Sequence, residues 1–162
     1  MDPLILIVAA GEGKRLMPLT EDTPKVMLPL DEQKNQPVIN PVINALSDDI
    51  ERAILLKKTK KFKGLEDYVA RVHGFDKEHI LYQDRITGSP YLPRQVSFIH
   101  LPLLYYLWKL PPYLSRNARF LRQFDPIILV PGDMIIPKPV DASGKNIYTA
   151  TLEHHRASGA DI

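Results

Sequence analysis

An apolar run at residues 4–10 (LILIVAA) breaks off into two glycines, Gly11 and Gly13, and two cations, Lys14 and Arg15. A run that is apolar at every position predicts a strand covered on both faces, because a strand with one face in water alternates apolar and polar residues. A glycine-rich turn directly after such a strand presents main-chain N–H groups that can surround phosphate oxygens. The start of the chain therefore predicts a buried strand followed by a phosphate site.

The rest of the chain alternates strand-like and helix-like segments. Further strands are expected at residues 52–56, 79–82 and 126–133. Helical spacing or capping signals are found at residues 41–49, 63–73 and 145–158. We expect Asn40 to cap the first helix, with Pro41 at its first position, and Gly159 to end the last. This alternation predicts an α/β domain with a largely parallel sheet.

Composition narrows the classes of function. The chain has 162 residues, of which 44% are apolar, enough for one sizeable core. It has no cysteine, which excludes disulfides and thiolate sites and favours a cytoplasmic protein. A net charge of +2 gives no general case for nucleic acid binding. The first apolar run is too short for a signal core or a membrane span, so we expect no membrane partner.

Two common phosphate-binding motifs do not fit the turn. A dinucleotide fingerprint that starts at Gly11 would need glycine or alanine at position 16, which is Leu16. A P-loop over the same turn would need glycine at position 8 and serine or threonine at position 15, where the chain has Val8 and Arg15. The turn must belong to another kind of phosphate site.

Residues 9–20 (AAGEGKRLMPLT) and 24–29 (PKVMLP) resemble the signature of the sugar-1-phosphate nucleotidyltransferases, or nucleotide-sugar pyrophosphorylases. The pattern of that family is a strand, then A-A-G-x-G-T-R-L-x-P-L-T, and then P-K-x-x-L-P. This chain departs from it at Lys14, where the family usually carries threonine. The resemblance implies a Rossmann-like three-layer α/β/α domain with a mainly parallel mixed sheet, of the nucleotide-diphospho-sugar transferase type.

The resemblance also implies how much of a domain is present. Residues 1–162 correspond to the N-terminal, nucleotide-binding portion of the family's catalytic domain, which continues with a sugar pocket and a second metal-binding aspartate. We therefore expect an incomplete domain, truncated at its C-terminus. Residues 92–122 form an aromatic and proline-rich insertion that is atypical of the family. We expect a helix and a loop packed on the sheet there; the alternative is a self-association or partner surface around residues 101–110, which leaves a homo-oligomer open.

The reaction implied by the resemblance is nucleotidyl transfer. A sugar 1-phosphate attacks the α-phosphorus of a nucleoside triphosphate, which gives an NDP-sugar and pyrophosphate. The resemblance assigns nucleotide binding to Ala10, Gly11 and Gly13. Arg15 and Lys25 are the catalytic candidates: a forked guanidinium suits the β- and γ-phosphates, and a compact ammonium suits the space between the α-phosphate and the sugar phosphate.

Three further site residues rest on weaker resemblances. Gln83 and Gly88 resemble the glutamine and glycine that follow the family's third strand, where the nucleobase is read; the alternative is that Gln83 only ends an edge strand. Asp133 resembles the aspartate of a strand ending in Gly-Asp that binds Mg²⁺, and its alternative is an ordinary turn residue. Carboxylates at the carboxyl ends of parallel strands lie where open α/β sheets bind ligands.

Two alternatives to the enzyme remain. One is a non-catalytic nucleotide-binding or regulatory subunit of the same fold, and the other is an unrelated Rossmann-type binding protein. The second would have no reason to carry the Pro-Leu-Thr and Pro-Lys elements of residues 18–20 and 24–25. The lysine-rich run at residues 57–64 (KKTKKFKG) is interpreted as a solvated face, not as a polyanion site.

Overall fold

Four strands form the central sheet of this protein, whose computed structural model describes residues 1–31, 36–83, 115–136 and 140–158. The strands are β1 (Asp2–Val8), β4 (Glu51–Lys57), β5 (Ile80–Gln83) and β6 (Phe124–Pro131). The helices are α1 (Ile39–Asn44), α2 (Lys63–His73), α5 (Ser115–Leu121) and α6 (Ile147–Ser158). Short elements complete the described chain: the 3₁₀ turns η1 (Lys14–Leu16), η2 (Lys25–Met27) and η3 (Lys60–Phe62), and the hairpin strands β2 (Pro29–Asp31) and β3 (Gln36–Pro37).

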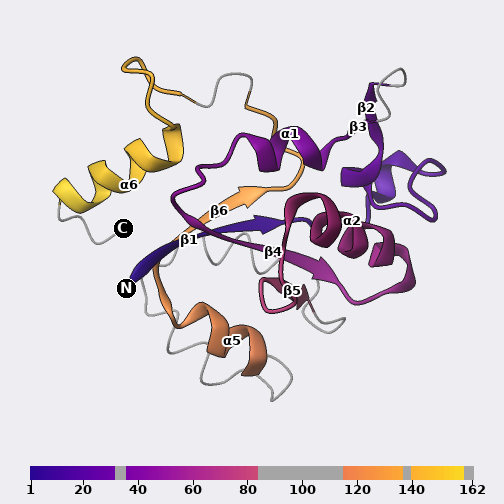
Figure 1. Cartoon of the computed structure of the whole chain (residues 1–162). Helices are drawn as coiled ribbons and strands as arrows, with labels where there is room; N and C mark the ends of the chain where they lie inside the picture. Colours follow the sequence, from indigo (N-terminus) through magenta and orange to yellow (C-terminus); the bar gives the residue numbers. More distant parts are fainter. Residues whose placement is uncertain (32–35, 84–114, 137–139, 159–162) are drawn as a thin grey trace.

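The four strands lie in the order β5-β4-β1-β6, and each neighbouring pair is parallel (Figure 1). The antiparallel pairing among the described strands is that of β2 with β3, which form a separate hairpin. Parallel neighbours need crossover connections, and helices supply them here: α1 lies between β1 and β4, and α2 between β4 and β5. The predicted α/β fold with a parallel sheet is confirmed.

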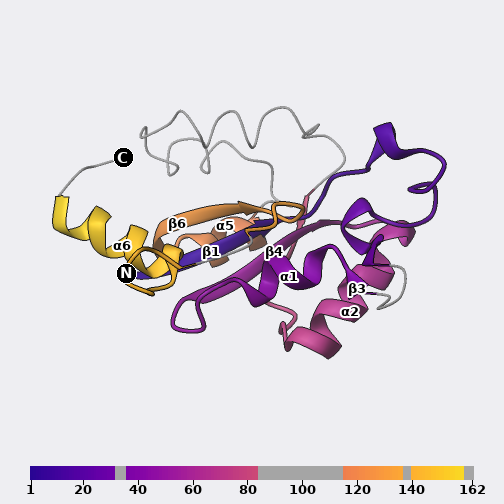
Figure 2. The same cartoon turned by 90° about the horizontal axis from the view of Figure 1, so that it is seen from above.

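Both faces of the sheet are buried. On one face Ile5 and Ile7 of β1 join a core that also holds buried residues of α1, α2 and α6. On the other face Leu4 and Leu6 pack with strand residues and with Phe120 and Leu121 of α5. Figure 2 shows α1 and α2 along one side of the strands. The continuous apolar pattern of β1 follows from this two-sided burial, since neither face of the strand meets water.

The first helix corrects one prediction. Asn40 is not its cap but lies inside it, because α1 begins at Ile39, two residues before the predicted first position at Pro41, and ends at Asn44. Ile39 is fully buried in the core, so packing draws it into the helix ahead of the capping signal. Beyond the helix the Asp49 N–H donates to Ser47 Oγ (3.4 Å), a local bond that turns the chain where residues 45–49 were expected to continue the helix.

The other helices lie close to their predicted positions. α2 spans residues 63–73 as predicted, and Gly74 ends it with φ 69°. α6 begins at Ile147, and Asn146 caps it by accepting the Tyr148 N–H through Oδ1 (3.0 Å). Among the described residues no helix combines the length and the apolar character that a membrane crossing requires.

Part of the predicted insertion at residues 92–122 can be placed. Its end forms α5, where Asn117 Nδ2 donates to the Tyr82 carbonyl at the end of β5 (2.8 Å). The expected helix packed on the sheet is therefore found at residues 115–121. Residues 92–114, with the apolar segment 101–110, and Gly88 lie outside the described residues.

Candidate functional site

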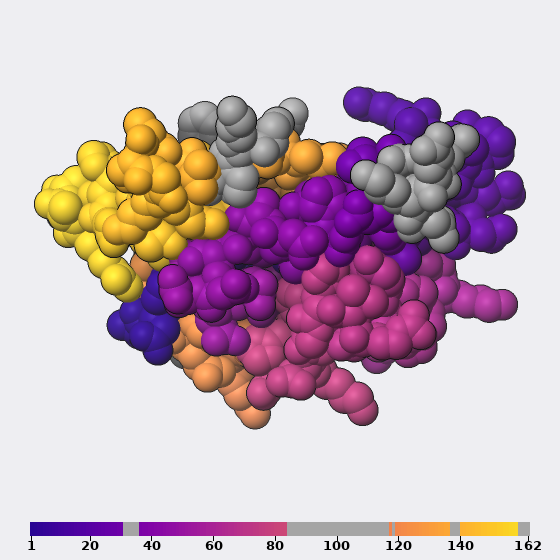
Figure 3. All heavy atoms as spheres, turned by 45° about the horizontal axis from the view of Figure 1, so that its top comes forward, coloured from indigo at the N-terminus to yellow at the C-terminus, as the bar shows by residue number. Residues whose placement is uncertain are grey.

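The carboxyl ends of the four parallel strands meet at one edge of the sheet. Register places Val8 beside Leu55 and Pro131, and Lys57 beside Gln83. The chain segments that follow these strand ends include the glycine turn, the lysine-rich run and Asp133. In the space-filling view, the loop after β1 lies at one end of the molecule and α6 at the other (Figure 3). This edge is where open α/β sheets bind ligands.

Gly13 has a conformation and a position that only glycine fits. Its φ is 69° and its ψ 27°, in the left-handed region. A Cβ atom at this residue would lie 2.9 Å from Thr20 Cγ2, closer than van der Waals contact allows. Thr20 is fully buried and donates through Oγ1 to the Gly13 carbonyl (2.7 Å), which also accepts the Leu16 N–H (2.8 Å). Thr20 therefore closes the glycine turn from the other end of the signature.

Lys25 lies against the glycine turn along its aliphatic stem. A Cβ atom at Gly13 would be 3.2 Å from Lys25 Cβ, and one at Gly11 would be 3.6 Å from Lys25 Cε. The ammonium group of Lys25 forms an ion pair with the Asp133 carboxylate. Both side chains are partly open to solvent, at 32% and 44% exposure. The structure thus brings together two predicted glycines, a predicted catalytic lysine and the predicted metal ligand.

Asp133 reaches this position because β6 ends close beside β1. The Gly132 N–H donates to the Val8 carbonyl (2.9 Å), and a Cβ atom at Gly132 would lie 3.0 Å from Ala9 Cβ. A larger residue at position 132 would force the two strand ends apart. The Gly-Asp pair therefore fixes where the carboxylate stands relative to the glycine turn.

The turn has hydrogen-bond donors to offer. Among the described residues, no acceptor is bound by the main-chain N–H groups of Gly11, Glu12 and Gly13, and all three residues have solvent-accessible surface. Arg15, in η1, is exposed and has no ion pair within the described part of the chain. The Ala10 side chain is buried, so only its main chain can meet a ligand. Unpaired N–H groups beside a lysine suit an anion such as phosphate.

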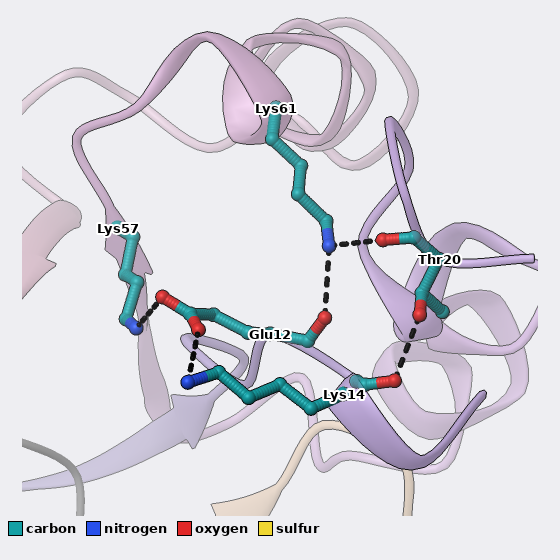
Figure 4. A network of polar contacts seen from close by, with 6 residues as sticks. Glu12, Lys14, Thr20, Lys57 and Lys61 are labelled. Atoms are coloured by element: carbon teal, nitrogen blue, oxygen red, sulfur yellow. Dashed lines mark hydrogen bonds and ion pairs between the residues drawn. The ribbon is translucent and has the colours of Figure 1, made fainter. Parts of the chain in front are cut away.

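The interpretation of the lysine-rich run as a solvated face is wrong for two of its members (Figure 4). Lys57, at the end of β4, is only 19% exposed and donates to the Glu12 carboxylate (2.6 Å). Lys61, in η3, donates to the main-chain carbonyls of Glu12 (2.8 Å) and Thr20. Charge spacing in the sequence could not reveal these contacts, because the acceptors lie 41, 45 and 49 residues earlier in the chain.

Glu12 is held by cations on two sides. Its second carboxylate oxygen lies 3.5 Å from the ammonium of Lys14, whose side chain is 85% exposed. The hydrogen bond and the charge of Lys57 hold the pKa of the Glu12 carboxyl below its ordinary value, and Lys14 acts more weakly in the same direction. Lys14, which replaces the threonine of the family signature, thus contacts the turn's own glutamate.

This arrangement predicts a pH-dependent contribution to stability. A carboxyl whose pKa is lowered on folding stabilises the protein above its ordinary pKa of 4.5, and this contribution disappears as the pH falls through the lowered value. Glu12→Gln is expected to cost about 0.5 kcal/mol at pH 7, the size of a solvent-screened ion pair. Thermal unfolding from pH 7 down to pH ~3 should show the two proteins converging in acid.

Glu21→Gln is the matched control for that measurement. Glu21 is exposed and carries no ion pair within the described part of the chain, so the same loss of charge should change little at any pH. A deficit in Glu12→Gln that persisted undiminished in acid would show that the carboxylate charge is not what stabilises the turn.

The fit of the site to Mg²⁺ depends on Asp133. No cluster of three or more histidine, cysteine, aspartate or glutamate residues is found within the described ranges. A single carboxylate fits Mg²⁺ bound together with a nucleotide, because this ion usually keeps several waters and takes one or two carboxylates plus substrate phosphates.

Gln83, the last residue of β5, is half-buried at the same edge of the sheet.

Comparisons with known proteins show the family of this chain. A family model described as Nucleotidyl transferase matches residues 4–162. The Bifunctional protein GlmU of Methanocaldococcus jannaschii is 40% identical over 89 residues, which cover 55% of this chain and 20% of the relative. The Bifunctional protein GlmU of Methanococcus aeolicus is 36% identical over 91 residues, 56% of this chain and 20% of the relative. The chain thus matches about a fifth of the length of these relatives. No solved structure matches it.

Proposed function

This chain belongs to the nucleotidyl transferase family, and from that premise we propose that it binds a nucleoside triphosphate at the glycine turn and transfers the nucleotidyl group to a sugar 1-phosphate. The proposal is supported by one observation: the main-chain N–H groups of the glycine turn, which have no acceptor within the described residues, lie at the carboxyl edge of the sheet beside Lys25 and its partner Asp133. The sugar 1-phosphate follows from the signature of residues 9–29.

The phosphates would occupy the space in front of the glycine turn. The N–H groups of Gly11 and Gly13 are donors without another partner in the described chain, and Gly11 has no side chain to keep a phosphate away. Nothing in the described part of the chain forbids a Cβ at Gly11, where the nearest atom would be at an ordinary contact distance of 3.6 Å. Glycine at this position is therefore explained by a ligand that approaches the main chain.

The two cations, Lys25 and Arg15, would bind different phosphates of the reacting groups. Lys25, beside the turn, would bind the α-phosphate and the incoming sugar phosphate as a point charge. Arg15, exposed and without an ion pair in the described chain, would bind the β- and γ-phosphates with its fork of donors. Because the departing pyrophosphate gains charge as it leaves, donors held in place beforehand favour its departure.

In the proposed reaction, an oxygen of the sugar phosphate forms a bond to the α-phosphorus. The bond from that phosphorus to the bridging oxygen breaks, and its electron pair leaves with the pyrophosphate. No protein nucleophile is required, so the side chains act by orienting the two phosphates and by offsetting their repulsion. A Mg²⁺ ion held by Asp133 and the triphosphate would supply further charge neutralisation.

In the ligand-free protein the Lys25 ammonium is paired with the Asp133 carboxylate, to which the metal would bind. Binding of a Mg-nucleotide would therefore exchange one partner of Asp133 for another and release the Lys25 ammonium toward the phosphates. The exchange costs little, because an ion pair exposed to this degree contributes at most about 1 kcal/mol.

Gln83 is the proposed base reader. Its amide has donors and acceptors and can pair with the edge of a pyrimidine. Its position at the end of β5 and at the edge of the described sheet suits both this role and that of a strand-terminal residue. Only a measurement of base selectivity separates the two.

Calorimetric titration with UTP, dTTP, GTP, CTP and ATP in the presence of Mg²⁺ tests the proposed function. At least one triphosphate is expected to bind, and pyrophosphate release with added sugar 1-phosphates then separates an enzyme from a non-catalytic nucleotide-binding subunit. Failure of all five to bind would remove the proposal.

Two variants divide the titration into its phosphate and base parts. Arg15→Ala should weaken every triphosphate by a similar factor, about tenfold for the loss of a charged multi-donor contact. Arg71→Ala, an equivalent change on the exposed face of α2, should not. Gln83→Ala should change the ratio of affinities among the bases, and an unchanged ratio with intact binding would leave Gln83 a strand-terminal residue only.

A further inference from the structure

Lys61 connects the glycine turn to the core of the protein. Its ammonium group donates to the main-chain carbonyls of Glu12 and Thr20 (Figure 4). These two residues lie near the two ends of the loop formed by residues 11–21. An ammonium has three donors, so two are used on these carbonyls. The residue that follows it, Phe62, is buried in the main core, which anchors the main chain that carries the lysine.

Apart from the Lys61 contacts and the bond of Lys57 to the Glu12 carboxylate, the hydrogen bonds of residues 11–21 in the described chain are made within that segment. Thr20 Oγ1 and the Leu16 N–H both bind the Gly13 carbonyl, and the Glu21 N–H binds the Pro18 carbonyl. Such bonds shape the loop but do not attach it to the rest of the molecule. Glycine loses more conformational freedom on ordering than any other residue, so an external anchor helps to hold a turn that contains two glycines.

The contact with Lys61 also sets the direction of a donor. The peptide between Glu12 and Gly13 is not among the cis bonds of the described chain, so its C=O and N–H point in opposite directions. Because the Glu12 carbonyl points to Lys61, the Gly13 N–H points away from it. Lys57 holds the Glu12 side chain from another side, which steadies the same peptide (Figure 4).

We propose that Lys61 is a positioning residue for the phosphates: by binding the Glu12 and Thr20 carbonyls together, it turns the Gly13 N–H toward the ligand and holds it there. The identity of the ligand rests on the proposed function, whereas the orientation of the peptide does not. Lys61 itself need not touch the phosphates, since its donors serve the main chain. Its contribution to affinity is made before the ligand arrives.

The test compares Lys61→Met with Lys60→Met. Methionine keeps much of the aliphatic stem and removes the ammonium. Lys60 is the exposed neighbour that loses the same charge, and its side chain makes no hydrogen bond or ion pair within the described residues. In the ligand-free protein, the Gly13 amide resonance is expected to shift and its hydrogen exchange to accelerate in Lys61→Met only. Lys61→Arg, which keeps a cationic group with several donors, should restore most of the resonance position. Circular dichroism verifies that each variant is folded, and Lys61→Gln replaces Lys61→Met if that variant is not.

The binding arm uses inorganic tripolyphosphate and the preferred nucleoside triphosphate, each with Mg²⁺. Lys61→Met should weaken both by the same factor, about tenfold, and Lys60→Met by less than about twofold. Equal losses in the two variants, or no loss in Lys61→Met, would overturn the proposal. A loss without any change at the Gly13 amide would also overturn it, since Lys61 would then contact the phosphates directly. Absence of binding by the unaltered protein would overturn the proposed function, and the glycine amide would still decide whether Lys61 orients the turn.

Discussion

Gly13→Ala is expected to abolish detectable triphosphate binding and to lower the free energy of unfolding by about 2–5 kcal/mol. Two costs add. A left-handed conformation costs a residue with a Cβ about 1–2 kcal/mol, and φ here is 69°. The new methyl group would also lie 2.9 Å from Thr20 Cγ2, and overpacking of this kind costs about 1–3 kcal/mol. Relief of the clash must move Thr20 or the turn, which displaces the N–H donors.

Gly74→Ala is the matched control, because it separates the two costs. Gly74 also has φ 69°, at the end of α2, but a Cβ there would meet nothing within 4 Å. Urea unfolding should therefore show the smaller loss of about 1–2 kcal/mol, with nucleotide affinity unchanged. If the two variants lost equal stability and both still bound nucleotide, the contact with Thr20 would not define the turn.

Lys25→Met is expected to reduce nucleoside triphosphate affinity by about 10- to 100-fold, as the loss of a charge-assisted contact with phosphate implies. Its effect on the free energy of unfolding should stay within about 1 kcal/mol, because the ion pair with Asp133 is exposed. Calorimetry and urea unfolding on the same samples measure both quantities. The combination of a large binding effect and a small stability effect distinguishes a ligand-binding lysine from a structural one.

Lys63→Met provides the comparison for that result. Lys63 forms ion pairs with Glu66 and Asp67 on the surface of α2, at 3.5 and 3.0 Å, so it also loses carboxylate partners and a charge. Affinity should be unaffected there. If Lys25→Met lost stability but kept its affinity, Lys25 would serve the fold and the proposed role at the α-phosphate would be wrong.

The elements of the fold were largely predictable because their signals are local. The helix predicted at residues 63–73 has the same bounds in the structure. Its buried Leu65 and Val69 repeat at helical spacing, and Gly74 follows directly. The strand predicted at residues 4–10 lies at Asp2–Val8. Its C-terminal end was predicted too late because Ala9 and Ala10 continue the apolar run and are buried, although the last paired residue is Val8. Asn40 failed as a cap because burial of Ile39 outweighed its capping preference.

The residues of the candidate site were also predicted from the sequence, whereas their arrangement was seen only in the structure. The signature predicted Gly11, Gly13 and Lys25 as site residues. The resemblance to a strand ending in Gly-Asp, supported by the rule that parallel strands end at one edge of a sheet, predicted Asp133. The structure places these four residues together, while their roles toward a nucleotide are proposals that the variants above test. Gly88 lies outside the described residues.

The sequence alone determined the class of fold and predicted the glycine turn as the candidate site, because apolar periodicity and glycine turns act through neighbours in the chain. Tertiary structure alone decided which charges meet: Lys61 binds a carbonyl 41 residues away, and Lys25 pairs with a carboxylate 108 residues away. Such contacts depend on how β1, β4 and β6 align, and alignment is set by packing of the whole core. The sequence predicts that a lysine within a run of lysines is solvated. Lys61 binds the Glu12 and Thr20 carbonyls only because the tertiary fold places those groups beside its ammonium.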